Sequence, residues 1–210
     1  PVFVEVDPRT FCVDPSAIEA AITQKTKVVF LTNPNNPTGT WFSQGDFERF
    51  MEKAPKNVLV VLDEAYCEYI DEPSFPNGLD YISHYENLIV TRTFSKIYGL
   101  AGLRVGYSVS HAEVANILNR VRQPFNVNQV ALHAAVAALG DDAFVSQSKT
   151  SNIAGLRQLE AGFRALNLSY IPSLGNFICF DLKQPGLPIY QALLYKGVIV
   201  RPVANYQLPT

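Results

Sequence analysis

The chain has 210 residues, of which 48% are hydrophobic and 17% are charged. Such an apolar composition excludes a disordered protein, and the length suits one large domain, alone or with part of another. The formal net charge of −2 argues against nucleic acid or an anionic membrane as a partner, and no apolar run approaches the ~20 residues needed to span a bilayer.

The cysteines and the ends of the chain bear on where the protein works. Cys12, Cys67 and Cys179 are far apart and lie mostly within apolar runs. Because their number and spacing suit neither disulfides nor zinc, we interpret them as buried thiols in a reducing cytoplasm. The chain starts at Pro1 with no methionine or signal-peptide pattern, and closes at Thr210 without a terminating element. We therefore expect an internal piece of a longer cytoplasmic polypeptide.

The first part of the chain is predicted to alternate between strands and helices. Val2 to Val6 has the pattern of a strand, and Asp14-Pro15 is a good helix start, so we expect a helix through Ile22. Lys27 to Leu31 is predicted to be a buried strand. Asn33 to Gly39, with its prolines and glycine, is predicted to be a rigid loop. Ser43, followed by Asp46, resembles a capping box for a helix to about Lys53.

Three further apolar runs are predicted to be strands of the same sheet. Val58 to Leu62 ends at Asp63, and Leu88 to Val90 begins a strand that leads to Thr93. The first of these would complete a right-handed βαβ unit over residues 27 to 62. Only residues 93 to 103 separate the second run from the third, Arg104 to Val109. A parallel crossover needs a dozen or more residues, so we expect the third strand to return antiparallel.

The rest of the chain is predicted to be mainly helical before a second, smaller α/β layer. Residues 67 to 86 are polar, aromatic and interrupted by proline, which indicates a surface segment. The predicted helices run from a Ser110 cap to about Arg122, from Gln129 to Leu139, from an Asp141 cap towards Leu166, and from Leu187 to Lys196, with strands at Asn176 to Leu182 and Val198 to Val203. A helix as long as the third often bridges domains. We place the boundary near Gly155, with a large domain over 1–154 and a small one over 155–210.

The predicted sheet brings chemically active side chains to one edge. Asp63 follows one strand, Thr93, Ser95 and Lys96 follow the next, and Arg104 opens the antiparallel return. Open α/β sheets bind ligands at the carboxyl ends of their strands. A lysine can form a Schiff base with an aldehyde, a carboxylate can keep a pyridinium nitrogen protonated, and hydroxyls with a guanidinium can bind phosphate. The set suits an anionic cofactor with a carbonyl group and a basic ring nitrogen.

Three motifs carry a family resemblance over nearly the whole chain. They are Asn33-Pro34-Asn35-Asn36-Pro37-Thr38-Gly39, Asp63-Glu64-Ala65-Tyr66, and Thr93-Phe94-Ser95-Lys96 with the segment from Tyr98 to Tyr107. In this order they resemble the fold-type I pyridoxal-phosphate aminotransferases. The resemblance implies an α/β fold with a mostly parallel sheet flanked by helices, part of a smaller α/β domain, and pyridoxal 5'-phosphate as cofactor.

The resemblance also implies roles for single residues at the cofactor. Lys96 would hold the cofactor as a Schiff base and, once freed, move the proton between substrate and cofactor carbons. Asp63 would hold the ring nitrogen protonated, and Tyr66 and Asn36 would donate hydrogen bonds to the phenolic oxygen. Thr93, Ser95 and Arg104 would bind the phosphate and, with the four residues above, complete the expected cofactor site.

Substrate recognition is implied for Arg201 and Asn36. Arg201, at the end of the strand predicted over Val198 to Val203, would meet the anionic end of the substrate. In the family two subunits share each active site, so the resemblance implies a homodimer. It also implies that these 210 residues alone are inactive and bind the cofactor poorly.

Each assignment has a plain structural alternative. Lys96, Arg104 and Arg201 could be solvated surface side chains, and the hydroxyls could bond only to local backbone. An apolar run ending in Asp63 also describes a Walker B strand, although no Walker A loop occurs in the chain. The histidines have no metal-ligand spacing and indicate no metal site.

The resemblance points to a particular reaction, with alternatives. It implies transfer of the amino group of histidinol phosphate, a small-molecule amino donor, to the 2-oxo acid 2-oxoglutarate, in histidine biosynthesis. An aromatic-amino-acid aminotransferase or a threonine-phosphate decarboxylase would show nearly the same motifs. A non-catalytic, pyridoxal-phosphate-sensing domain of a regulator is the alternative from another functional class.

Overall fold

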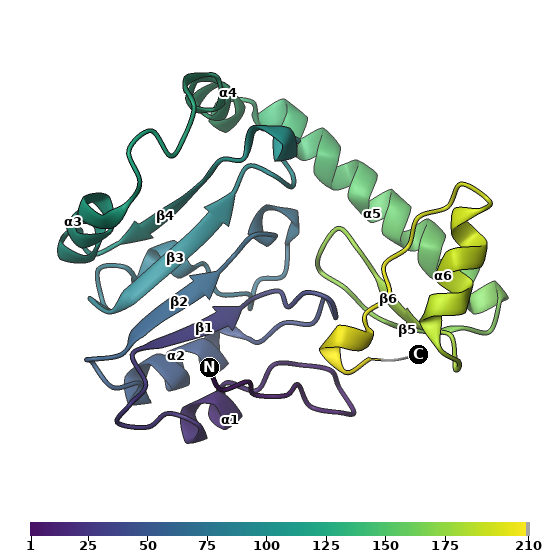
Figure 1. Ribbon diagram of the computed structural model, residues 1–210, viewed down its shortest axis with the longest axis horizontal. Coiled ribbons are helices and arrows are strands. Elements are labelled where there is room, and N and C mark those ends of the chain that lie inside the picture. The colour runs from purple at the N-terminus through teal and green to yellow at the C-terminus, as the bar shows by residue number, and fades with distance from the viewer. Residues whose placement is uncertain (209–210) are drawn as a thin grey trace.

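The computed structural model describes residues 1–208, arranged as two sheets joined by one long helix (Figure 1). The larger sheet contains β1 (Val28–Thr32), β2 (Leu59–Asp63), β3 (Leu88–Thr93) and β4 (Gly106–Ser110), in that order. β1, β2 and β3 are parallel, and β4 returns antiparallel to β3. This confirms the predicted α/β class and the antiparallel return.

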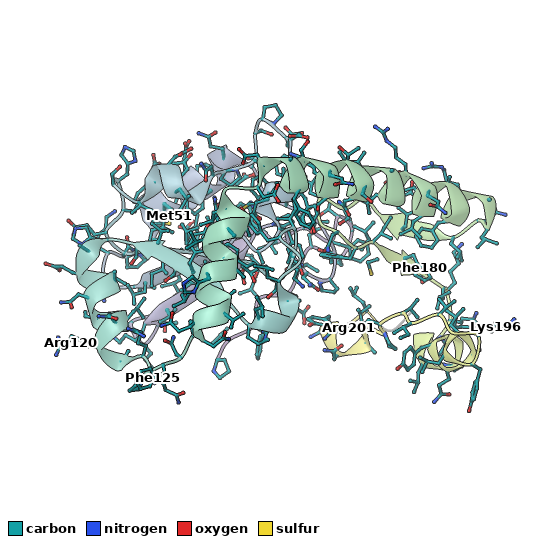
Figure 2. The ribbon with its side chains drawn as sticks, turned by 90° about the horizontal axis from the view of Figure 1, so that it is seen from above. Met51, Arg120, Phe125, Phe180, Lys196 and Arg201 are labelled. Atoms are coloured by element: carbon teal, nitrogen blue, oxygen red, sulfur yellow. The ribbon has the colours of Figure 1, made fainter. Side chains whose placement is uncertain are left out.

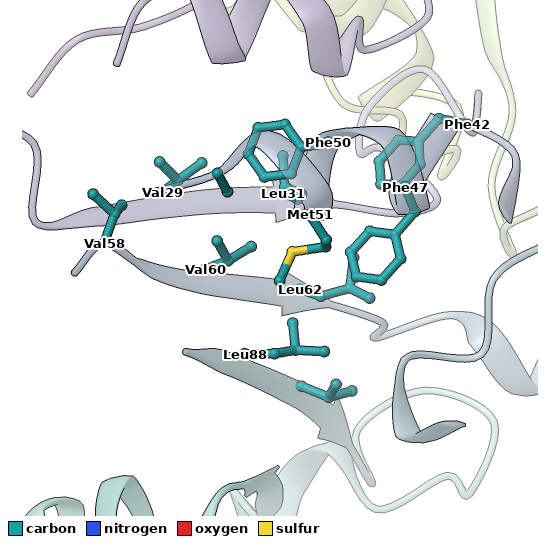
Figure 3. Packing of buried hydrophobic residues seen from close by; sticks show 12 residues of the cluster. Val29, Leu31, Phe42, Phe47, Phe50, Met51, Val58, Val60, Leu62 and Leu88 are labelled. Carbon is teal, nitrogen blue, oxygen red and sulfur yellow. The ribbon is translucent and has the colours of Figure 1, made fainter. Parts of the chain in front are cut away.

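One face of the larger sheet forms the main core. Alternate residues of each strand point to one face, and Leu31, Val60 and Leu62 are fully buried there. They pack against α2 (Gln44–Lys53), whose Phe47, Phe50 and Met51 are also buried (Figure 3). The cluster also contains Val29, Phe42, Ala54, Val58, Leu88 and Val90.

Local capping explains where the first helices begin. α1 (Pro15–Ala20) has Asp14 as its N-cap, whose side chain accepts a hydrogen bond from the Ser16 amide. α2 begins with the predicted capping box, in which Ser43 and Asp46 satisfy one another's backbone amides. Both helices lie below β1 in Figure 1.

The segment after β4 folds into three helices. These are α3 (Ala112–Val121), α4 (Gln129–Leu139) and α5 (Asp142–Ala165). Asn128 caps α4, and Asp141 caps α5 by accepting from the Phe144 amide. A second core cluster joins Ala131 and Ala135 of α4 to Phe94 and Val105. α4 therefore supports the segment after β3 that contains Lys96.

The smaller part packs along the far half of α5. It contains the antiparallel pair β5 (Ser169–Ile171) and β6 (Cys179–Asp181), followed by α6 (Gly186–Leu194). Four short 3-10 helices complete the described chain: η1 (Cys67–Tyr69), η2 (Gly78–Tyr81), η3 (Ala101–Leu103) and η4 (Ala204–Tyr206). Gly155 lies inside α5, so a division there would cut a continuous helix, and the boundary stays a prediction.

Several local predictions were wrong. Residues 2–6 and 198–203 are irregular, because a strand requires a backbone partner and neither segment has one within residues 1–208. Ser110 belongs to β4, and the N-cap of α3 is His111, whose side chain makes no capping bond. β5, only three residues long, was not predicted.

The described part of the chain contains neither a membrane-spanning helix nor a metal-binding cluster. None of its helices combines the length and the apolar character that crossing a bilayer requires. Residues 1–208 also contain no group of three or more His, Cys, Asp or Glu side chains arranged to hold a metal ion.

Candidate active site

The predicted site residues near the sheet come from its carboxyl edge. Asp63 ends β2 and is aligned with Thr32 of β1 and Thr91 of β3. The Asn33 amide donates to the Asp63 carbonyl at 3.0 Å, which ties the start of the Asn33–Gly39 loop to the end of β2. Lys96 lies in the turn after β3. Parallel pairing of the three strands therefore brings residues distant in sequence to one edge.

Lys96 and Asp63 interact electrostatically at this edge. Burial raises the pKa of Asp63 above its ordinary value, while the Ala65 amide, 3.0 Å from the Asp63 Oδ1, and the charge of Lys96 lower it less. The Lys96 Nζ lies 5.3 Å from the centroid of the Tyr66 ring, a cation–π distance. An amine, a half-buried carboxylate and an aromatic face thus occupy one small region.

Tyr66 and Asn36 are joined directly, as their shared assignment requires. The Asn36 Nδ2 donates to the Tyr66 hydroxyl at 2.8 Å, across 30 residues of sequence. Tyr66 is 5% exposed, and its ring meets that of Phe177 edge-on with centroids 5.1 Å apart. The Tyr66 side chain is therefore held at its hydroxyl by the loop after β1 and at its ring by Phe177 of the smaller part of the molecule.

Thr93, Ser95 and Arg104 form a second polar group. The Ser95 amide donates to the Thr93 Oγ1 at 3.0 Å, and the Arg104 Nη1 approaches the Ser95 Oγ at 3.4 Å and the Ala101 carbonyl at 3.0 Å. Arg104 itself is exposed and has a left-handed backbone, with φ of 55°. Two hydroxyls, a guanidinium and turn amides are the donors that bind phosphate.

Arg201 lies apart from this group. It is exposed, in the irregular segment after α6, and its guanidinium stacks over the Tyr206 ring at 5.9 Å (Figure 2). The strand that was predicted to carry it is not formed. Its role towards a substrate stays a prediction.

A cavity of about 670 Å³ opens beside Lys96. Tyr69, Asn176 and Phe177 line it together with Lys96, and the opposite wall is a face of α5 that includes Ser151 and Asn152. None of these lining residues except Lys96 was predicted as part of the site. The sequence offered one signal for Tyr69, its position three residues after Tyr66. It offered none for Asn176 and Phe177, because their contact with the cavity depends on how the two parts of the molecule pack.

This arrangement has definite chemical capacities. Lys96 supplies a nucleophilic amine and a proton carrier, and Asp63 supplies a carboxylate where burial disfavours charge unless a cation is near. The Asn36–Tyr66 pair can hydrogen-bond an oxyanion. Thr93, Ser95 and Arg104 can bind a phosphate group. The residues at the sheet edge therefore suit one aromatic ligand with a phosphate tail and a reactive carbonyl.

Comparison with known proteins agrees with this chemistry. Over 196 residues the chain is 59% identical to "Histidinol-phosphate aminotransferase 2" of Pseudomonas fluorescens, covering 93% of this chain and 53% of that protein. A solved structure titled as a putative histidinol-phosphate aminotransferase from Erwinia carotovora superposes with a TM-score of 0.89 at 34% identity, over 94% of this chain and 57% of that one. The chain spans about half the length of the curated relatives it matches.

A further solved structure carries the ligand type that the site suits. It is a histidinol-phosphate aminotransferase from Sinorhizobium meliloti in complex with pyridoxal-5'-phosphate, with a TM-score of 0.84 at 30% identity, over 90% of this chain and 52% of that one. The model of one protein family, described as "Aminotransferase class I and II", matches residues 1–210. The ordered motifs, the sheet that brings them together and this family match show that the chain belongs to the class I and II aminotransferase family.

Proposed function

We propose that the protein containing this chain is a pyridoxal-phosphate-dependent aminotransferase that transfers the amino group of histidinol phosphate to 2-oxoglutarate. The observation that carries the proposal is the position of the Lys96 amine, which lies over the Tyr66 ring and interacts electrostatically with the Asp63 carboxylate. The names of the relatives at 59% and 58% identity support the choice of substrate. A cytoplasmic location is part of the same proposal.

The residues present fit the cofactor. Asp63 would hold the ring nitrogen, and its raised pKa indicates a carboxylate that lacks a sufficient counter-charge until a protonated ring nitrogen supplies one. Tyr66 and Asn36 would hold the phenolic oxygen, and Thr93, Ser95 and Arg104 the phosphate. When bound, the cofactor supplies an electron sink that stabilises negative charge at the substrate carbon.

The chain's own residues would perform binding and proton transfer. The Lys96 amine would attach the cofactor aldehyde and later carry a proton between the substrate and cofactor carbons. This amine is partly buried and lies over the Tyr66 ring. The Asn36–Tyr66 hydrogen bond would keep the phenol in a fixed orientation. Tyr69, Asn176 and Phe177 would line the substrate side of the cavity.

The decisive experiment is an assay of the whole protein and its Lys96→Ala variant. We expect amino transfer from histidinol phosphate, and a loss of at least about 10²-fold for the variant, since it lacks the proton carrier. Lys53→Ala is the matched control, because Lys53 is a largely exposed lysine paired with Glu19 at 3.2 Å. If phenylalanine were the preferred donor, or if the protein released CO₂ from threonine phosphate, the proposed substrate would be wrong.

We also propose that the whole protein is a homodimer. Support comes from apolar side chains on α3, on α4 and between them: Val121, Phe125, Val130 and Val136 are 69–98% exposed, and Phe125 extends from the rim of the molecule in Figure 2. We expect sedimentation to give a dimer for the parent protein and a monomer for Val136→Asp. Leu166→Asp, a similarly exposed leucine after α5, should leave the dimer intact. A monomeric parent protein would contradict the proposal.

A further inference from the structure

Glu64 is a fully buried carboxylate next to the candidate site. It is 0% exposed, yet both of its oxygens are satisfied. The Glu64 Oε2 accepts from Arg92 Nε at 3.0 Å and Nη2 at 2.6 Å, and the Oε1 accepts from the Gly78 amide at 2.6 Å. A buried charge is tolerated when it is paired and fully hydrogen-bonded, as here.

This ion pair lies directly behind the residues of the site. Glu64 follows Asp63 in sequence, and Arg92 precedes Thr93. Because successive strand residues point to opposite faces, Glu64 and Arg92 share the core face with Leu62 and Val90, and Asp63 and Thr93 point to the other face. The pair therefore links the ends of β2 and β3 from the side opposite the candidate cofactor.

The pair extends the sheet beyond its last backbone bond. The pairing of β2 with β3 ends with Asp63 opposite Thr91, and the Glu64 amide then donates to the Thr91 carbonyl at 2.9 Å. The next link between the two strands is the Glu64–Arg92 side-chain pair. Within residues 1–208 the only hydrogen bond of the Asp63 side chain is the local one from the Ala65 amide, two residues on, so its position relative to β3 depends on the links around it.

A third element joins this link. Arg92 Nη2 also donates to Asn77 Oδ1 at 2.7 Å, and Gly78 brings its amide against Glu64. A Cβ on Gly78 would lie 2.7 Å from Val90 Cγ2 and 2.8 Å from Leu62 Cδ2, so only glycine permits this approach. The start of η2 is thereby fixed to both strand ends.

We propose that Glu64 and Arg92 are positioning residues that set Asp63 relative to Thr93 and Lys96. They would fix the distance between the carboxylate at the cofactor's ring nitrogen and the groups at its phosphate and aldehyde ends. This inference rests on the proposed function. Neither residue touches the cofactor in this arrangement; both act through the strand ends.

The test compares Glu64→Gln and Arg92→Lys with Glu48→Gln in the whole protein. Glu64→Gln keeps the size of the side chain and loses the charge, and Arg92→Lys keeps the charge and loses the two-nitrogen grip. Glu48 is a matched control, because it accepts from the Tyr81 hydroxyl at 2.6 Å and ties α2 to η2 on the same face of the sheet, without contact to Asp63 or Thr93.

The first readout is amide hydrogen exchange without cofactor. We expect exchange at Glu64 and Ala65 to rise about tenfold or more in both site variants and to stay at the parent rate in Glu48→Gln. Unchanged exchange at these amides in both site variants would overturn the proposal. This arm does not depend on the cofactor, so it separates the inference from the proposed function.

The second readout is the bound cofactor itself. Loss of an outer partner of a metal ligand commonly costs about 10–100-fold in metal affinity, and by the same reasoning we expect a loss of this size in the affinity for pyridoxal phosphate. We also expect the pH titration of its visible absorbance to shift, because Asp63 would no longer meet the ring nitrogen at a fixed distance. An equal shift of this titration in Glu48→Gln, at a matched melting temperature, would show a general effect of stability and contradict the positioning role.

Discussion

At the scale of single residues, the site contains groups whose surroundings disfavour their charged form or hold their hydrogen bonds in one orientation. Asp63 is the clearest case. Burial raises its pKa, and neither the Ala65 amide nor Lys96 restores the ordinary value. In the absence of a ligand, folding therefore favours the protonated form of Asp63. A carboxylate of this kind lowers the stability of the cofactor-free protein and raises that of the cofactor-bound protein.

Asp63→Asn should therefore stabilise the cofactor-free protein at neutral pH. The Asn side chain can still accept from the Ala65 amide and bears no charge. Because the pKa of Asp63 is raised in the folded state, its contribution to the free energy of unfolding is complete below the unfolded-state pKa. That contribution is lost as the pH rises through the folded-state pKa. We expect a melting temperature a few degrees above the parent at pH 7, and no difference at pH values below the ordinary aspartate pKa.

Calorimetry from acid to neutral pH measures this difference. The same variant should bind pyridoxal phosphate more weakly, since it cannot neutralise a protonated ring nitrogen. A parent protein more stable than Asp63→Asn at pH 7, with no cofactor present, would contradict the sign derived from burial.

The hydrogen bond between Asn36 and Tyr66 should be measurable as a coupling energy. Tyr66→Phe keeps the ring against Lys96 and Phe177 and removes only the acceptor of the Asn36 amide. With Asn36→Ala, a double-mutant cycle by urea unfolding should give about 0.5–1.5 kcal/mol, the usual net value of one hydrogen bond. Strictly additive losses would mean that the 2.8 Å contact contributes nothing to stability.

At the scale of elements, the loop Asn33–Gly39 joins the two parts of the molecule. The Leu174 amide donates to the Gly39 carbonyl at 3.0 Å. Gly39 has φ of +74°, and a Cβ there would lie 2.0 Å from the Ser173 Oγ and 2.8 Å from the Ser173 Cα. The backbone conformation and the close approach both require glycine. Asn36, in the same loop, depends on this seating for its reach to Tyr66.

Gly39→Ala should destabilise the protein, and Gly45→Ala should not. We expect a loss of about 1–3 kcal/mol for the first, because it combines a strained backbone with a clash against Ser173. Gly45 lies in α2, where an added Cβ makes ordinary contacts with the Arg49 Nη1 at 3.7 Å and the Ser43 Oγ at 3.9 Å, so alanine should be neutral or gain up to about 1 kcal/mol. Urea unfolding of both variants makes the comparison. Equal effects would refute the proposed packing role of Gly39.

The elements also show what could be predicted from the chain and what could not. The apolar run that stops at Asp63 and the apolar run from Leu88 to Val90 were enough to predict two parallel strands, and the short link to Arg104 was enough to predict the reversal. The capping residues Asp14, Ser43 and Asp141 act as predicted. These signals are local, and each has one dominant physical cause.

Predictions failed where a partner elsewhere in the chain decides the outcome. Residues 198–203 have the apolar pattern of a strand, but a pattern does not supply a neighbour for the backbone. Glu64 and Arg92 are 28 residues apart, and neither shows alone that the other will neutralise it. Phe177 reaches Tyr66 only because the two parts meet. Arg201 was placed at the end of a strand that does not form, so its position could not follow.

At the scale of the whole molecule, α5 links the two sheets without a break. Its 24 residues span about 36 Å at 1.5 Å per residue. Near its middle the Asn152 Nδ2 donates to the Gly175 carbonyl at 3.2 Å, and Ser151 and Asn152 line the cavity beside Lys96. The same helix thus supports the smaller sheet and forms a wall of the candidate site (Figure 1).

The contacts of residues 173–177 make this junction sensitive to a change in the angle between the two sheets. Within five positions, this stretch bonds to Gly39, accepts from Asn152 and packs Phe177 on Tyr66. A hinge movement of the smaller sheet cannot leave all three anchors in place, so it must displace the phenol or strain the Leu174–Gly39 bond. The position of the Tyr66 ring would then depend on the angle between the two sheets. The chain has ten tyrosines, so in fluorotyrosine-labelled protein the ¹⁹F signal that is missing from Tyr66→Phe is the one that would report this movement.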